Sequence, residues 1–259
     1  MIKENLKLSI VTPNLNGGKY IEQTIKSVIN QNYKNIEYII VDGGSTDNSH
    51  AIIKKYLNHV KHFVVRKDKN MYEAINHGFS LARGDILTWI NSDDFYYDNC
   101  LKSILKKIEK NNYRWINCIS SSTSKGKISA YPVPFYFPQK YIIEGRCHKS
   151  DFGFIPQESV FFTKKLYIKS GGVTAKYQLA GDYYFWKKMA THEKLQPINL
   201  KCAIFRKRRG QLSGDMLGYY KEIKKNIFIK EIFLDFFYLS FISFFMVINL
   251  KPLKIMNCY

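Results

Sequence analysis

The sequence predicts an α/β fold in which a mostly parallel sheet is flanked by helices, and three observations support this prediction. Short apolar runs typical of buried strands alternate with amphipathic helical patterns over the first hundred residues. Polar residues follow several of these runs at the point where each strand would end. The chain has 259 residues, 46% of them hydrophobic, which is enough for one substantial domain with a real core.

The predicted elements of the first hundred residues follow one another in a regular order. Strands are predicted at 6–12, 36–41, 62–66 and 85–90, and helices at 20–30, 71–82 and 101–110. Residues 43–57 are predicted to form a turn, a Ser/Thr/Asp cap region and a helix. The strand at 36–41 is too uniformly apolar for an exposed edge, so we place it inside the sheet. A repeating strand–helix order of this kind forms parallel sheets that helices cover on both faces.

The pattern breaks down between Tyr113 and about Ser150. Residues 120–127 (SSSTSKGK) are predicted to form an exposed loop, and the proline-rich segment 131–139 cannot be a central strand. A strand at 157–162, a turn at Gly171 and Gly172 and a helix at 182–190 then restore the order. We therefore divide the chain into a domain over 1–217, with halves at about 1–112 and 113–217, and a tail over 218–259.

The tail is predicted to be helical, basic and apolar. Its run 236–250 (FFYLSFISFFMVINL) contains no charged residue, but it is shorter than the roughly 20 residues that span a bilayer comfortably. The preferred interpretation is a helix that inserts shallowly into an anionic membrane surface. The alternative is a core helix that packs back on the sheet.

Composition limits the compartment and the partners. The net charge of +19 favours a polyanionic partner, either nucleic acid or an anionic membrane, although a lysine-rich proteome would also explain it. The five cysteines form no CxxC pair and no zinc spacing, which fits a reducing compartment. The N-terminus does not show the pattern of a signal peptide, so we expect a cytosolic protein.

Polar residues are expected to gather on one rim of the sheet. Ligands of parallel sheets bind at the carboxyl ends of the strands. Eight residues are predicted on that rim: Thr12, Pro13, Asn14, Asp42, Arg66, Asp68, Asn91 and Asp93. The adjacent carboxylates Asp93 and Asp94 would suit a surface turn, and they would also suit Mg²⁺ or Mn²⁺, which prefer carboxylate oxygens. The convergence of four strands on this edge favours the cation site.

Two stretches, 8–49 and 66–94, resemble the family 2 glycosyltransferases, which have the GT-A fold with a Rossmann-like sheet. The similarity is closest to bacterial members that build O-antigen and capsular polysaccharides, and it covers roughly 7–213. It implies an inverting glycosyltransferase that moves a sugar from a nucleotide-sugar donor, with UDP as the default, to a lipid-linked or polysaccharide acceptor in surface polysaccharide biosynthesis. The halves 1–112 and 113–217 would then bind the donor and the acceptor.

The resemblance also implies roles for individual residues. It places Thr12, Pro13, Asn14, Asp42, Asp68 and Asn91 in the nucleotide-sugar pocket, and Arg209, Gln211 and Ser213 over the diphosphate. Residues 91–93 take the D-x-D position, with Asp93 as the ligand of Mn²⁺ or Mg²⁺. Asp182 corresponds to the general base, although it could instead be the N-cap of its helix. The sequence departs from the family at Asn91 and Gly43, where Asp is common.

The rival hypothesis is a non-catalytic or nucleic-acid-binding protein on the same α/β scaffold. A nucleic-acid reader would show a basic stripe with interleaved stacking aromatic residues. The dense basic cluster of this chain, residues 205–213, coincides instead with the segment expected at the diphosphate. The sequence therefore favours a glycosyltransferase without a nucleic-acid partner, held peripherally at the cytoplasmic face of the cell membrane.

Overall fold

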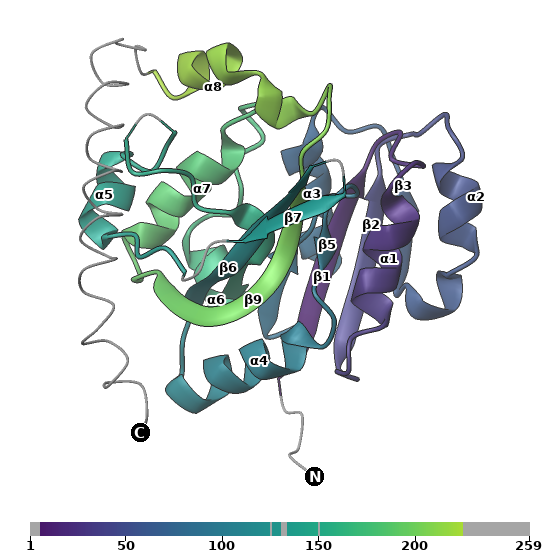
Figure 1. Ribbon diagram of the computed structural model, residues 1–259, viewed down its shortest axis with the longest axis horizontal. Helices are drawn as coiled ribbons and strands as arrows, with labels where there is room; N and C mark the ends of the chain where they lie inside the picture. The colour runs from purple at the N-terminus through teal and green to yellow at the C-terminus, as the bar shows by residue number, and fades with distance from the viewer. Residues whose placement is uncertain (1–5, 125, 131–133, 150, 225–259) are drawn as a thin grey trace.

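The computed structural model describes residues 6–124, 126–130, 134–149 and 151–224 (Figure 1). Within these ranges nine strands form one sheet in the order β3-β2-β1-β4-β8-β6-β9-β5, with β7 paired to β6. The strands are β1 (Leu8–Asn14), β2 (Ile36–Asp42), β3 (His62–Val65), β4 (Ile86–Trp89), β5 (Phe95–Tyr96), β6 (Trp115–Ser124), β7 (Lys127–Ala130), β8 (Val160–Thr163) and β9 (Gln196–Arg206).

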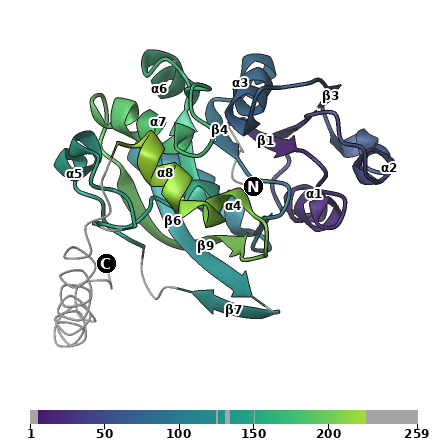
Figure 2. The ribbon, with the colours of Figure 1, turned by 90° about the horizontal axis from the view of Figure 1, so that it is seen from above.

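Helices cover both faces of this sheet, as predicted. They are α1 (Ile21–Ile29), α2 (Ser49–Lys54), α3 (Met71–Leu81), α4 (Cys100–Asn111), α5 (Gln139–Glu144), α6 (Lys164–Lys169), α7 (Gly181–Ala190) and α8 (Met216–Glu222). Apolar side chains of α1, α2 and α4 pack on one face, and those of α3, α5, α6 and α7 pack on the other. Figure 2 shows α1 and α3 on opposite sides of strand β1. Short 3-10 helices lie at Leu57–His59, Gln157–Ser159 and Leu212–Gly214.

The first half of the sheet is parallel. Strands β3, β2, β1 and β4 run in the same direction, and the register places Asn14 beside Asp42 at the end of their strands. All seven residues of β1 are buried, because helices shield both faces of this strand. The predicted α/β fold with helices on both faces is confirmed here.

The second half of the sheet is mixed. Strand β8 is antiparallel to both β4 and β6, and β9 is parallel to β6 and antiparallel to β5. The predicted loop at 120–127 is wrong, because β6 extends to Ser124 and pairs with β7. The side chains of Ser121 and Thr123 are buried within this strand. Small polar residues do not alternate with apolar ones, so the sequence pattern did not predict a strand here. The strand forms because neighbouring strands pair with it on both sides.

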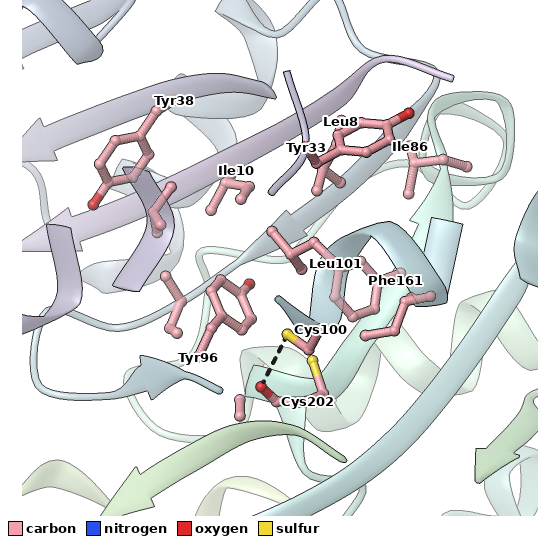
Figure 3. Packing of buried hydrophobic residues seen from close by; sticks show 14 of the residues in the cluster. Leu8, Ile10, Tyr33, Tyr38, Ile86, Tyr96, Cys100, Leu101, Phe161 and Cys202 are labelled. Atoms are coloured by element: carbon pink, nitrogen blue, oxygen red, sulfur yellow. Dashed lines mark hydrogen bonds between the residues drawn. The ribbon is translucent and has the colours of Figure 1, made fainter. Parts of the chain in front are cut away.

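The core contains large apolar clusters on the two faces of the sheet. Figure 3 shows one of them, in which strand residues such as Leu8 and Ile10 meet Leu101 of α4. The thiol of Cys100 lies in this cluster, with its sulfur 3.4 Å from the carbonyl oxygen of Cys202. On the opposite face three buried tryptophans stack at centroid distances of 5.4 and 5.9 Å: Trp89, Trp186 and Trp115.

Helix α8 crosses the boundary that was predicted between residues 217 and 218. Tyr219, Tyr220 and Ile223 are buried against Ala180 and Tyr183, at the start of α7. The first residues of the predicted tail therefore belong to the packed domain. The apolar run 236–250 lies outside the described residues, and none of the helices within the described ranges is long and apolar enough to cross a membrane.

Candidate active site

Asp42 forms the centre of a hydrogen-bond network at the end of β2. Its Oδ2 accepts a hydrogen bond from Asn14 Nδ2 at 2.6 Å, and its Oδ1 accepts from the backbone nitrogens of Gly44 and Ser45 at 3.0 and 2.7 Å. His50 Nε2 lies 2.8 Å from Oδ1. Burial by itself raises the pKa of Asp42, but these donors outweigh it and hold the pKa below its usual value. Asp42 is therefore a buried group that carries a negative charge at neutral pH.

The other predicted residues of β1 have different environments. The hydroxyl of Thr12 is buried and lies 3.1 Å from the hydroxyl of Tyr38 in the core. Pro13 is buried and lies opposite Val41 of β2. Asn14 is thus the residue of this stretch whose side chain reaches Asp42.

Asp68 lies just beyond the end of β3. Arg66 Nε is 2.8 Å from Asp68 Oδ1, and the backbone nitrogen of Arg66 donates to the carbonyl oxygen of Asp42 at 2.9 Å. Burial raises the pKa of Asp68, while the adjacent guanidinium partly opposes this effect. The structure therefore places Asp68 next to the strand end that carries Asp42, as the rim prediction requires.

The turn at 91–94 lies directly against the loop that follows β1. A Cβ on Gly17 would stand 2.2 Å from Asn14 Oδ1 and 2.7 Å from Ser92 Oγ, so only glycine permits this approach. The hydroxyl of Thr24 in α1 lies 3.0 Å from the carbonyl oxygen of Ser92 and 2.6 Å from that of Asp94. Helix α1 thus fixes the turn beside Asn14.

Two arginines, one at the end of β9 and one just after it, contact this turn. Arg208 Nε donates to Asp93 Oδ2 at 2.6 Å, and Arg206 Nε donates to the carbonyl oxygen of Asp93 at 2.8 Å. The sequence prediction selected Arg209, which is exposed and forms no hydrogen bond or ion pair within the described part of the chain. The two-residue spacing of Arg206 and Arg208 was the available signal, because alternate residues of an extended chain share one side.

A pair of buried carboxyl groups lies behind the turn. Asp94 is 1% exposed, and burial together with the carboxyl group of Glu158 raises its pKa well above the usual value. Burial also raises the pKa of Glu158, which accepts a hydrogen bond from Ser120 Oγ. The sequence prediction missed Glu158, although a glutamate beside the apolar run 160–162 is an unusual feature that needs a partner.

Asp182 lies in the first turn of α7. The helix begins at Gly181 with Ala180 as its N-cap, so the alternative role of Asp182 as the N-cap residue is wrong. Asp182 Oδ1 accepts from the backbone nitrogen of Tyr183 at 2.8 Å and from the hydroxyl of Tyr72 at 3.2 Å. Burial raises the pKa of Asp182 to about 6, which suits a group that accepts a proton near neutral pH.

The turn that contains Asp93 also contains two oxygen donors without a partner in the described part of the chain. The Oδ1 atom of Asn91 and the Oδ2 atom of Asp94 are buried without a hydrogen-bond partner among the described residues. In the same part of the chain no group of three or more His, Cys, Asp or Glu side chains is arranged to hold a metal ion. Magnesium is commonly held by one or two carboxylates together with phosphate oxygens and water. The donors at this turn therefore fit a divalent cation that binds together with a diphosphate.

Comparison with known proteins identifies relatives of the chain. Residues 9–168 match the family model described as glycosyl transferase family 2. The chain is 33% identical over 106 residues to the glycosyltransferase GlyG of Streptococcus pneumoniae serotype 4, covering 40% of this chain and 35% of GlyG. It is 37% identical over 108 residues to an uncharacterized glycosyltransferase of Haemophilus influenzae, covering 40% and 43% of the two chains. The matched region is less than half the length of either relative.

Solved structures share the fold. S. aureus TarS 1–349 in complex with UDP-GlcNAc superposes with a TM-score of 0.65 at 16% identity, over 81% of this chain and 61% of TarS 1–349. The mannosyltransferase PcManGT of Pyrobaculum calidifontis, in complex with GDP-Man and Mn²⁺, gives 0.61 at 16% identity, over 87% and 66%. These similarities confirm the predicted fold class. Since the family model covers more than half of the sequence, the chain belongs to glycosyl transferase family 2.

Proposed function

We propose that this protein is an inverting glycosyltransferase that moves a sugar from a nucleotide-sugar donor to a hydroxyl group of a lipid-linked or polysaccharide acceptor. The proposal rests on three carboxyl groups that differ in their pKa values and in their surroundings. Asp42 is held charged at the rim, Asp93 lies in a turn with two oxygen donors, and the pKa of Asp182 is about 6. A single displacement by a base-activated hydroxyl inverts the anomeric centre.

The donor pocket follows the rim of the parallel half. Asp42 and Asp68 would accept hydrogen bonds from the base and the ribose, and Asn14 would keep Asp42 in place through its 2.6 Å hydrogen bond. Thr12 and Pro13 would form the floor of the pocket, and Asn91 would bind the ribose. Arg209, which is exposed, would close over the diphosphate. The UDP-GlcNAc complex of TarS supports UDP as the default nucleotide. The GDP-Man complex of PcManGT makes GDP-sugars the second class of donor to test.

Asp93 would hold Mn²⁺ or Mg²⁺. A bound cation supplies positive charge to the leaving diphosphate, on which negative charge builds as the glycosidic bond breaks. Asp182 accepts the proton of the attacking acceptor hydroxyl. The hydroxyl of Tyr72, 3.2 Å from Asp182 Oδ1, orients this carboxylate, and Gly181 allows the close packing because a Cβ there would stand 2.5 Å from the Tyr72 ring.

Donor hydrolysis tests this function. We would screen UDP- and GDP-sugars with Mn²⁺ and compare the wild type with Asp93→Ala, with circular dichroism as the control for folding. We expect one donor to be hydrolysed and Asp93→Ala to lose this activity, because the cation contributes several kcal/mol to leaving-group stabilisation. Near-normal turnover by a folded Asp93→Ala variant would leave residues 91–94 as a structural turn. Salt-sensitive binding to single-stranded DNA without nucleotide binding would favour the rival hypothesis.

We place this reaction in surface polysaccharide synthesis, such as O-antigen assembly, at the cytoplasmic face of the cell membrane. The net charge of +19 and the uncharged run 236–250 support a peripheral position, since each lysine near anionic lipid contributes about 1 kcal/mol. Because Tyr219 and Tyr220 pack on the domain, the informative truncation follows Lys224 rather than Gly218. The truncated protein should stop co-sedimenting with anionic vesicles and still hydrolyse donor. Misfolding of the truncated protein would contradict the membrane role, and so would an intact protein that does not bind anionic vesicles.

A further inference from the structure

Arg206 is locked against the turn by several contacts. Its Nε donates to the carbonyl oxygen of Asp93 at 2.8 Å, and its Nη2 donates to Gln23 Oε1 at 2.5 Å. Its guanidinium carbon lies 4.8 Å from the ring centroid of Tyr20 and 5.0 Å from that of Phe95. Cation–π contacts of this kind and the hydrogen bonds act together, so Arg206 is a fixed part of the turn.

Arg208 is attached in a different way. Within the described residues its side chain forms one ion pair, from Nε to Asp93 Oδ2 at 2.6 Å, and its guanidinium carbon lies 5.7 Å from the Tyr20 ring centroid. The side chain is 34% exposed. Partly exposed ion pairs stabilise a fold only weakly, so the contact can be exchanged for another at little cost.

We propose that Arg208 is an internal counter-ion for Asp93 that a divalent cation displaces, and that Arg208 then binds the donor diphosphate. This inference rests on the cation role that we proposed for Asp93. The guanidinium of Arg208 donates a hydrogen bond to Asp93 Oδ2, and a divalent cation bound to the same oxygen would repel this guanidinium. The planar fork of an arginine matches two phosphate oxygens, so the displaced side chain gains a partner of opposite charge.

The exchange couples the two ligands. A cation on Asp93 frees Arg208 for the diphosphate, and a diphosphate that takes Arg208 frees Asp93 for the cation. By linkage, each ligand must then raise the affinity for the other by the same factor. Loss of the guanidinium should therefore tighten the binding of the cation alone and weaken the coupling between cation and nucleotide.

Direct measurement of Mn²⁺ binding tests the counter-ion. The full-length protein, without nucleotide, would be titrated with Mn²⁺ and followed by electron paramagnetic resonance. We expect Arg208→Gln to bind Mn²⁺ about threefold more tightly than the wild type, which corresponds to about 0.7 kcal/mol. Lys207→Gln is the matched control, because it removes one charge from an exposed neighbour that makes no ion pair with Asp93. An equal gain in both variants, or no gain in Arg208→Gln, would overturn the proposal.

A second titration tests the transfer of Arg208 to the diphosphate. Calorimetry with UDP at saturating Mn²⁺ should show about tenfold weaker binding to Arg208→Gln than to the wild type. Unchanged UDP affinity would overturn this part of the proposal.

The two proposals fail in different ways. If neither the wild type nor Arg208→Gln binds Mn²⁺ while UDP still binds, the cation role of Asp93 and the exchange both fail. Donor hydrolysis in the presence of a chelator would then still test the glycosyltransferase. Tighter Mn²⁺ binding by Arg208→Gln in a protein that hydrolyses no donor would support the counter-ion and contradict the proposed function.

Discussion

Asp42 and Asp182 are both carboxyl groups that the fold shields from water, yet their pKa values move in opposite directions. Burial raises the pKa in each case, but Asp42 receives hydrogen bonds from several donors and its pKa ends below the usual value. The Oδ1 atom of Asp182 receives only a backbone nitrogen and the hydroxyl of Tyr72 within the described residues, and its pKa rises to about 6. The balance between burial and hydrogen-bond donors therefore decides whether a shielded carboxyl group stays charged at neutral pH or accepts a proton near pH 6.

Glu158 and Asp94 extend this comparison to a pair of carboxyl groups. Both are buried, and each has its pKa raised, chiefly by burial. Glu158 accepts from the hydroxyl of Ser120, and Asp94 Oδ1 accepts from the backbone nitrogen of Arg206 at 2.8 Å. These donors are too few to stabilise two charges, so the pair resembles Asp182 more than Asp42.

The largest expected effect is that of Asp182→Asn on turnover. The amide keeps the shape of the side chain and removes its basicity, so glycosyl transfer should fall by about 10²- to 10⁴-fold while UDP binding persists. Steady-state kinetics and calorimetry would measure the two quantities. Transfer at the wild-type rate would make Asp182 a structural residue and remove the contrast with Asp42.

The pH dependence of the wild type is the control for this variant. Since a base acts only when ionised, the rate should rise with pH through about 6 and then level off. The hydrogen bond from the hydroxyl of Tyr72 lowers the pKa of Asp182, so in Tyr72→Phe the rise of the rate should shift to higher pH. An unchanged pH profile in this variant would show that a group other than Asp182 controls the rate.

Asp42→Asn should have a smaller effect, on stability. The amide places an NH₂ group against donors of hydrogen bonds, which costs about 1–3 kcal/mol and lowers the melting temperature. The folded-state pKa of Asp42 is depressed, so its stabilisation is present above the unfolded value of about 3.9 and is lost as the pH falls through the folded value. Thermal melts should therefore show a deficit at pH 7 that shrinks below about pH 4. A deficit that is independent of pH would contradict the role of the charge.

Glu158→Gln should have the smallest effect, and it should stabilise the protein rather than destabilise it. Glutamine keeps an oxygen for the hydroxyl of Ser120 and removes a buried acid whose ionisation is unfavourable, so the variant should gain roughly 1 kcal/mol at pH 7. The folded-state pKa of Glu158 is raised, so its favourable contribution is present below the unfolded pKa and is lost as the pH rises through the folded one. The gain should thus be small near pH 4 and larger at neutral pH. A melting temperature that falls at neutral pH would show that the charge is needed.

The parallel half of the fold was predictable from the sequence because its signals are local. Each strand from β1 to β4 is an apolar run, each of the helices α1 to α4 has a repeating apolar face, and the polar residues follow at the strand ends. Parallel pairing then brings Asn14 and Asp42 together without further information, since the strand ends share one edge. The same rule selected Asp93, and the family resemblance added Asp182; the roles of both residues remain predictions.

The tertiary structure alone decided the rest. The serine-rich end of β6, residues 120–124, is recognisable only through its pairing with β9 and β7, because these residues have no apolar periodicity. The contact of Arg208 with Asp93 joins residues 115 positions apart, and that of Tyr72 with Asp182 joins residues 110 positions apart. No local pattern encodes such contacts or the donors around each carboxyl group. The sequence therefore determined which carboxyl groups the chain carries, and the packing of distant segments determined which of them hold a charge.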